Sequence, residues 1–149
     1  MDWGQAFSIA NTTVLVCWLF LILLPRYAWL VFGLKQIVIA SICVIYSVVI
    51  FLFISGVEGG GFGSLEQVKA LFRSDAVVFA GWIHYLAFDL FVGMWIAERC
   101  DTMKLHRVFQ ACILVATLML GPFGLLLYFA YEAGRTVFNR NDFARSSPS

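Results

Sequence analysis

The chain has 149 residues, of which 62% are hydrophobic and only 13% are charged, and its formal net charge at pH 7 is +1. A composition this apolar is typical of a membrane protein rather than of a soluble domain. Its 10 Lys and Arg residues are spread singly along the chain, which excludes the broad basic surface that nucleic-acid binding requires. We therefore expect an all-α membrane protein with no nucleic-acid partner.

Four apolar segments reach the length of about 20 residues that a helix needs to cross the hydrocarbon core of a bilayer. They cover residues 7–25, 37–55, 77–97 and 108–131. The short connectors 26–36 and 98–107 make the spans that they join antiparallel neighbours. The sequence thus predicts one polytopic domain, a bundle of four transmembrane helices, followed by a polar, frayed tail over residues 132–149.

Targeting and orientation follow less directly from the spans. No basic flank precedes the first apolar run, which is too long for a signal-peptide core, so we expect the first helix to remain in the mature protein. The Lys and Arg residues divide five against five between the two sides of the membrane. The positive-inside rule therefore assigns no orientation.

The connector 56–76 is long enough to hold structure of its own. Its glycine-rich start, residues 59–63, predicts a flexible loop and not a phosphate loop, because no Lys-Ser or Lys-Thr follows. Ser64 and Gln67 then match a capping box, and an apolar stripe follows at Leu65, Val68, Leu71 and Phe72. We expect a short interfacial helix between spans 2 and 3, lying on the membrane surface.

The third span carries two ionisable residues, His84 and Asp89, within its apolar run. An Asp at the centre of a membrane helix costs roughly 2.5–3.5 kcal/mol, so it must be paired, protonated or facing a polar cavity. Groups buried in this way are candidates for general acid and base catalysis. The alternative is structural, an interhelical hydrogen bond that holds the bundle together.

Helix geometry separates these two residues. At about 100° per residue, His84 and Asp89 point about 140° apart and cannot pair directly on this helix. They must meet different neighbours or flank one cavity. The candidate lining residues on their two faces are Trp82 and Tyr85 with Asp89, and Phe88 and Phe91 with His84.

Other spans bring polar groups to a similar depth. The first span runs parallel to the third, which places Asn11 within about one turn of His84 and makes it a candidate partner. In the fourth span Gly121-Pro122-Phe123-Gly124 removes a backbone donor and predicts a kink level with the two ionisable residues. Kinks also arise from packing alone, so this reading stays open.

We expect no metal and no cofactor. His84 and Asp89 lie five residues apart, and the other histidine, His106, falls in a connector. The spans supply too few acidic residues for a carboxylate-bridged di-metal site.

Three motifs resemble those of the abscisic acid-deficient-four family: Phe7-Ser8-Ile9-Ala10-Asn11, the third-span run from Trp82 to Phe91, and Gly121-Pro122-Phe123-Gly124. The resemblance covers nearly the whole chain, and the third-span motif is the most specific. Plant members are four-span plastid membrane proteins required for making neoxanthin from violaxanthin. This chain shows no transit peptide, so the resemblance implies a bacterial relative, a multi-pass protein of the inner (cell) membrane.

The resemblance also implies an intramembrane isomerase that acts on a carotenoid or similar polyene. Opening an epoxide to an allenic alcohol needs one proton delivered to oxygen and one removed from carbon, with no redox cofactor. By analogy, protonated Asp89 is the acid, His84 is the base and Asn11 orients the oxygen, and the reverse assignment stays open. The residues expected to contact the substrate are Asn11, Trp82, Tyr85, Phe88, Phe91 and Pro122.

The residues leave open whether the chain is an enzyme. One alternative is a non-catalytic membrane protein that binds a carotenoid or assists other membrane enzymes, as a homo-oligomer or in a complex with them. Another is a small transporter subunit. Intramembrane Asp and His residues favour this function in general, although the chain shows no inverted repeat.

Overall fold

The computed structural model describes residues 2–24 and 27–146, which are helical apart from short connectors and contain no strand. Two compact units divide within one long helix, after Met94. The elements in chain order are α1 (Trp3–Leu23), α2 (Ala28–Gly33), the π-helical η1 (Leu34–Ile39), α3 (Ala40–Phe53), the 3-10 turn η2 (Ile54–Gly56), α4 (Leu65–Leu71), α5 (Asp75–Thr102), α6 (Arg107–Leu120) and α7 (Pro122–Ser146).

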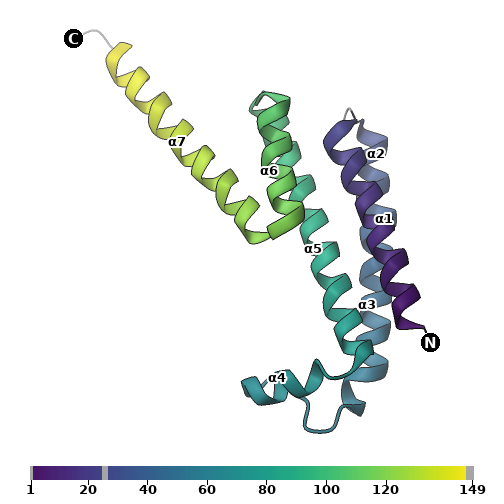
Figure 1. The fold of residues 1–149 in the computed structure, drawn as a ribbon. Coiled ribbons are helices and arrows are strands. Elements are labelled where there is room, and N and C mark those ends of the chain that lie inside the picture. Colours follow the sequence, from purple (N-terminus) through teal and green to yellow (C-terminus); the bar gives the residue numbers. More distant parts are fainter. Residues whose placement is uncertain (1, 25–26, 147–149) are drawn as a thin grey trace. The chain divides into compact units, whose positions relative to one another are not determined.

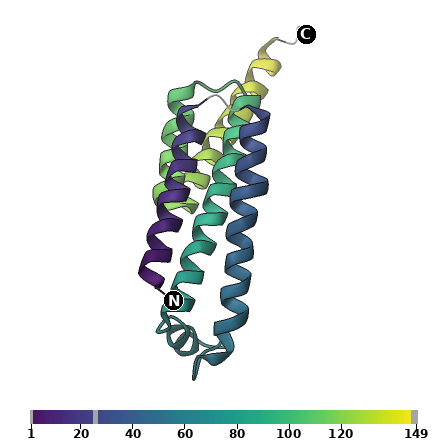
Figure 2. The ribbon, with the colours of Figure 1, turned by 90° about the vertical axis from the view of Figure 1, so that its right-hand side faces the viewer.

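In the first unit α1, α3 and α5 run side by side, with α1 parallel and α3 antiparallel to α5 (Figures 1 and 2). Large apolar side chains fill the space between these helices. Trp18 of α1 and Ile83 of α5 are each only 1% exposed, and Leu90 is fully buried. The core of this unit therefore lies along the inner faces of α1 and α5.

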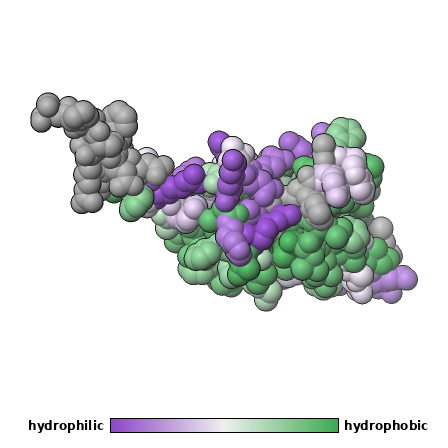
Figure 3. Space-filling model, turned by 90° about the horizontal axis from the view of Figure 1, so that it is seen from above, coloured by the Kyte–Doolittle hydropathy of each residue, from purple (hydrophilic) through white to green (hydrophobic). Residues whose placement is uncertain are grey.

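Within the described part of the chain, three helices are long and apolar enough to cross a membrane: Trp3–Leu23, Trp29–Gly56 and Asp75–Thr102. Large hydrophobic side chains remain on their outer surfaces, for example Phe51, which is 84% exposed. Hydrophilic residues gather instead on the end face seen from above, beside a hydrophobic flank (Figure 3). An apolar surface of this extent supports membrane association.

The second span begins well before its predicted start at residue 37, because the chain is already helical from Ala28. Lys35, which suggested a connector, does not end the helix. Its ammonium group lies 5.7 Å from the centre of the Phe91 ring. A long side chain that rests on an aromatic face keeps its charge off the hydrocarbon, so the helix can continue through it.

The predicted fourth span, residues 108–131, is two helices and not one kinked helix. Gly121 separates α6 from α7 with φ 45° and ψ −97°, a conformation that favours glycine. A helix of 14 residues covers about 21 Å, less than the roughly 30 Å hydrocarbon core. The structure therefore does not confirm the four-span bundle.

Within the second unit α7 turns back along α6. Gly124 lies so close to Thr117 that a Cβ atom at this position would collide with the Thr117 backbone. Further along, Arg135 donates a hydrogen bond to the Met103 carbonyl, 2.9 Å away, just before α6 begins. The two helices thus form an antiparallel hairpin.

Residues 132–146 of the predicted polar tail are helical and continue α7. Glu132 accepts a hydrogen bond from the Tyr128 hydroxyl at 2.9 Å, and Thr136 donates one to the Glu132 carbonyl. Contacts at this spacing support a helix beyond its apolar part. Residues 147–149 lie outside the described part of the chain.

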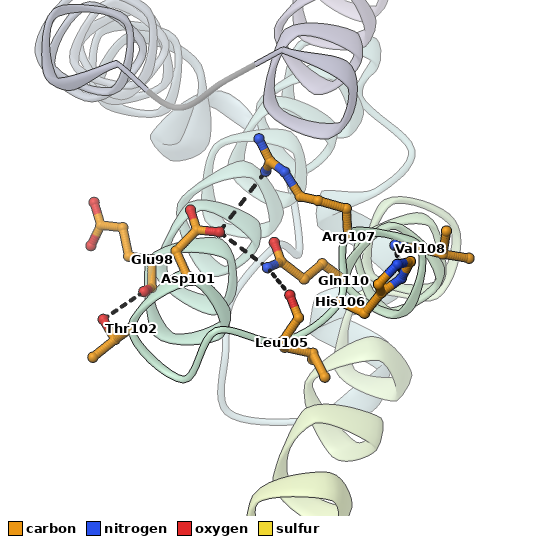
Figure 4. Close-up of polar contacts among 8 residues, drawn as sticks. All are labelled: Glu98, Asp101, Thr102, Leu105, His106, Arg107, Val108 and Gln110. Atoms are coloured by element: carbon orange, nitrogen blue, oxygen red, sulfur yellow. Dashed lines mark hydrogen bonds and ion pairs between the residues drawn. The ribbon is translucent and has the colours of Figure 1, made fainter.

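The polar connector expected after the third span is partly helix, because α5 continues to Thr102. The remaining turn is held by Gln110, which is 2% exposed and donates to the Asp101 carboxylate and to the Leu105 carbonyl (Figure 4). Arg107 lies 3.9 Å from the same carboxylate. The polar residues from which we predicted a connector thus hold the start of α6 against the end of α5 through hydrogen bonds and an ion pair.

The capping box before α4 is confirmed with one difference. The Ser64 hydroxyl accepts a hydrogen bond from the Gln67 backbone, as expected, but the Gln67 side chain accepts from Gly63 and not from Ser64. The short helix lies beside the start of α5 and runs crosswise to it (Figure 1). This direction suits a helix lying flat on a membrane, and its position at the membrane surface stays a prediction.

Candidate functional site

The side of α5 that faces α1 carries the first group of predicted site residues. Trp82 donates a hydrogen bond from its indole nitrogen to the Asn11 side-chain oxygen at 2.7 Å, and the rings of Phe7 and Trp82 lie 5.2 Å apart. Farther along, Gly93 packs against the Trp18 ring. The partner that the structure gives Asn11 is therefore Trp82, not His84.

His84 lies on the other side of α5, toward α3. Its ring centre is 5.3 Å from that of Tyr46 and 4.5 Å from that of Phe88, with which it stacks at an interplanar angle of 27°. An imidazole between two aromatic rings has its orientation restricted by both. His84 is exposed at the surface of the protein, so a ligand can reach it from outside.

Two cavities lie at neighbouring helical turns between the second and third long helices, and we call them together the α3–α5 groove. One, of ≈ 230 Å³, is lined by Ile39 and Cys43 on one side and by Phe88 and Phe91 on the other. The second, of ≈ 170 Å³, is lined by Tyr46 and His84 and extends to Leu71 at the end of α4. His84 of the second cavity stacks on Phe88 of the first.

The groove follows consecutive helical turns along its whole length. On the α3 side its lining residues recur every three or four positions: Ile39, Cys43, Tyr46, Ile50 and Ile54. This stripe is roughly 22 Å long, most of the roughly 30 Å hydrocarbon core. Leu71 and Phe72 line its α4 end, and the Lys35 ammonium group lies over the Phe91 ring at the other.

Asp89 belongs to neither cavity of the groove. Its carboxyl group interacts with the side chain of Tyr85, one turn earlier on α5. Its second oxygen, Oδ2, is buried and has no hydrogen-bond partner among the described residues. His84 and Asp89 are thus held in different surroundings on the same helix, as their spacing predicts.

The remaining predicted contact residue, Pro122, is the first residue of α7 in the second unit. Its expected position level with His84 and Asp89 stays a prediction. Among the described residues, no three His, Cys, Asp or Glu side chains gather as a metal-binding group.

Tyr46 lines the α3–α5 groove and is absent from the residues predicted to form the site. Taken alone, a tyrosine in an apolar helix is typical of packing. The usable signal was the stripe on the second span, in which Tyr46 lies on the same face as Ile39, Cys43, Ile50 and Ile54. Only the pairing of α3 with α5 shows that this face meets His84.

Comparison with known families identifies the family to which the chain belongs. A family model described as ABA DEFICIENT 4-like matches residues 5–128. The chain belongs to this ABA4-like family. The match includes α1 from its third residue onward, α3, α5 and the whole α3–α5 groove. Membership suggests a role related to the neoxanthin and abscisic acid pathway. No curated protein and no solved structure matches the chain significantly.

Family membership confirms the resemblance drawn from the three sequence motifs. It carries no support for the bacterial origin that the sequence led us to expect.

Proposed function

We propose that this ABA4-like protein binds a carotenoid-like polyene in the α3–α5 groove and isomerises it by acid–base catalysis, as a multi-pass protein of the membrane. The observation that carries the proposal is the place of His84, an ionisable residue halfway along an apolar, aromatic-lined groove. Family membership supports the substrate class.

The groove suits a long, rigid, apolar molecule. Its lining is almost entirely hydrocarbon and aromatic, and such surfaces bind apolar ligands through burial alone. Phe88 and Phe91 follow His84 on the same face of α5, and both side chains are exposed. A polyene dissolved in the bilayer can therefore enter sideways without crossing water.

The reaction requires little of the protein. When an epoxide opens to an allenic alcohol, a carbon–hydrogen bond breaks, its electron pair forms the new double bond, and the carbon–oxygen bond of the epoxide breaks. The oxygen gains one proton and the carbon loses one, so atoms and electrons balance with no oxidant or reductant. We assign the removal of the proton from carbon to His84 in its neutral form.

Asp89 enters this proposal in a role different from the one that its sequence position suggests. It does not line the groove, and its carboxyl group interacts with Tyr85. We propose that Asp89 supports the fold on its own side of α5 and does not touch the polyene. A different residue of the groove must then supply the acid.

The test is turnover of an epoxidised carotenoid by purified protein in lipid nanodiscs, with products separated by chromatography and identified by mass spectrometry. We expect His84→Ala to lower the rate by about 10²-fold or more, the usual contribution of a general base. Asp89→Asn should leave a readily measurable rate. His106→Ala is the matched control, because it removes the other histidine of the chain, outside the first unit.

Either of two results would contradict the proposal. Unchanged turnover in His84→Ala would show that His84 is not the base. Pigment retained by the wild-type protein without any product would instead favour the non-catalytic binding protein, for which the same groove serves as a carrier site.

A further inference from the structure

Tyr46 is the only side chain from α3 that the structure brings against the His84 ring among the described aromatic contacts. The two ring centres are 5.3 Å apart, with the planes inclined by 50°. Both side chains line the same cavity of ≈ 170 Å³. A ligand in this cavity therefore meets an imidazole from one helix and a phenol from the other.

We propose that Tyr46 is the acid of the isomerisation, donating its hydroxyl proton to the epoxide oxygen while His84 takes the proton from carbon. This assignment rests on the proposed function and replaces Asp89 as the proton donor.

Position favours this pair over Asp89, because Asp89 lines neither cavity of the groove. A phenol and an imidazole between them offer one proton donor and one proton acceptor. Tyr46 and His84 line the same cavity, so one bound epoxide can lie next to both side chains.

Because Tyr46 and His84 are neighbours, both can return to their starting protonation states after each turnover. After one turnover His84 holds the proton from carbon and Tyr46 has lost one to oxygen, which leaves an imidazolium beside a phenolate. Opposite charges at this separation attract strongly in a medium of low dielectric constant. Transfer of one proton from His84 to Tyr46 restores both residues, so the site needs no exchange with water.

The shape of the groove places the reacting atoms at this pair. An engineered cavity of about 150 Å³ binds benzene, so the ≈ 170 Å³ cavity next to α4 has room for a six-membered ring. The polyene chain would then continue through the cavity between Cys43 and Phe88. The epoxide of such a carotenoid lies on the ring, at the carbon that carries the chain. His84 and Tyr46 line the ring cavity one helical turn from Phe88 and Cys43, which line the chain cavity.

The experiment compares Tyr46→Phe with the wild-type protein in nanodiscs, measuring kcat, KM and the amount of epoxidised carotenoid that co-purifies. We expect kcat to fall by about 10²-fold or more. KM and bound pigment should change by less than about twofold, because Phe keeps the ring and its apolar contacts. Tyr27→Phe is the matched control, since Tyr27 is exposed and its ring stacks on Trp29 outside the groove.

The outcomes separate this inference from the proposed function. Full activity in Tyr46→Phe together with loss in His84→Ala would overturn the role of Tyr46 and leave the isomerase standing. A parallel loss of bound pigment and rate would make Tyr46 a binding residue and overturn its role as acid. Absence of turnover in the wild-type protein would overturn both proposals. A thermal melt of each variant shows whether the bundle has stayed intact.

Discussion

The two sides of α5 differ in how closely they pack against the neighbouring helices. Toward α1, the helix offers Gly93 and Trp82, which the Trp18 ring and the Asn11 amide meet directly. Toward α3, it offers His84 and Phe88, and cavities remain between the helices. On the α1 side, the small residue Gly93 lets the Trp18 ring pack directly against α5. On the α3 side, the aromatic rings of Tyr46 and His84 meet between the two helices and leave cavities beside them.

This difference shows how a small bundle can be rigid on one side of a helix and keep cavities on the other. Close contact on the α1 side fixes the position of α5 through dense packing, which proteins use to hold elements rigidly. The α3 side is then free to leave space unfilled. We therefore expect substitutions on the α1 side to change mainly stability and substitutions on the α3 side to change mainly binding and turnover.

The largest effect on the closed side should come from Gly93→Ala. Its new Cβ atom would overlap the Trp18 ring, which is only 1% exposed and has no room to move away. Overpacking of this kind typically lowers the free energy of unfolding by about 1–3 kcal/mol. The measurement is a thermal or denaturant unfolding curve in a fixed lipid or detergent.

Gly33→Ala provides the matched control, because a Cβ atom at Gly33 meets nothing within 4 Å. It should be neutral or stabilise the helix by up to about 1 kcal/mol. Equal effects of the two substitutions would show that the α1 side is not closed by the Gly93–Trp18 contact.

On the open side, Gly81→Leu should block the groove while sparing the fold. Gly81 lines the cavity next to α4, and even a Cβ atom there would lie 3.1 Å from the Phe72 ring. A leucine side chain would fill the space that we assign to the carotenoid ring, so we expect pigment retention to fall about tenfold, equivalent to about 1.4 kcal/mol. Retention is measured by absorbance of the co-purified pigment.

Gly56→Leu is the control for Gly81→Leu, since a side chain at Gly56 meets open space. Normal pigment retention in Gly81→Leu, with an unchanged unfolding curve, would show that the ligand does not occupy the cavity next to α4.

Sequence reasoning predicted the long helices better than the contacts between them. Length and hydropathy are properties of single segments, which is why the three long spans and the capping residue Ser64 followed from the sequence. The separation of His84 from Asp89 followed from helix geometry alone. The pairing of Tyr46 with His84 depends on which face of α3 meets α5, and no local pattern contains that information.

The fourth predicted span is not confirmed, for a related reason. An apolar run across Gly121 and Pro122 fits either a kinked helix or two helices joined by a tight turn. The choice depends on whether α7 can pack back on α6, which the absence of a side chain at Gly124 permits beside Thr117. That contact is tertiary, and hydropathy does not detect it.

The smallest expected effect tests the polar contact on the closed side. Asn11→Leu removes the acceptor of the 2.7 Å hydrogen bond from Trp82 while keeping a side chain of similar size. Hydrogen bonds between membrane helices contribute on average about 0.6 kcal/mol, and at most about 1.7 kcal/mol, so the free energy of unfolding should fall by less than in Gly93→Ala. Trp82→Phe should cost a similar amount in hydrogen bonding, and a double-mutant cycle isolates the coupling between the two residues. A loss of turnover in Asn11→Leu without a matching loss of stability would contradict the division between the two sides, because Asn11 would then orient the substrate oxygen, as the family resemblance implies, and the reaction would draw on both sides of α5.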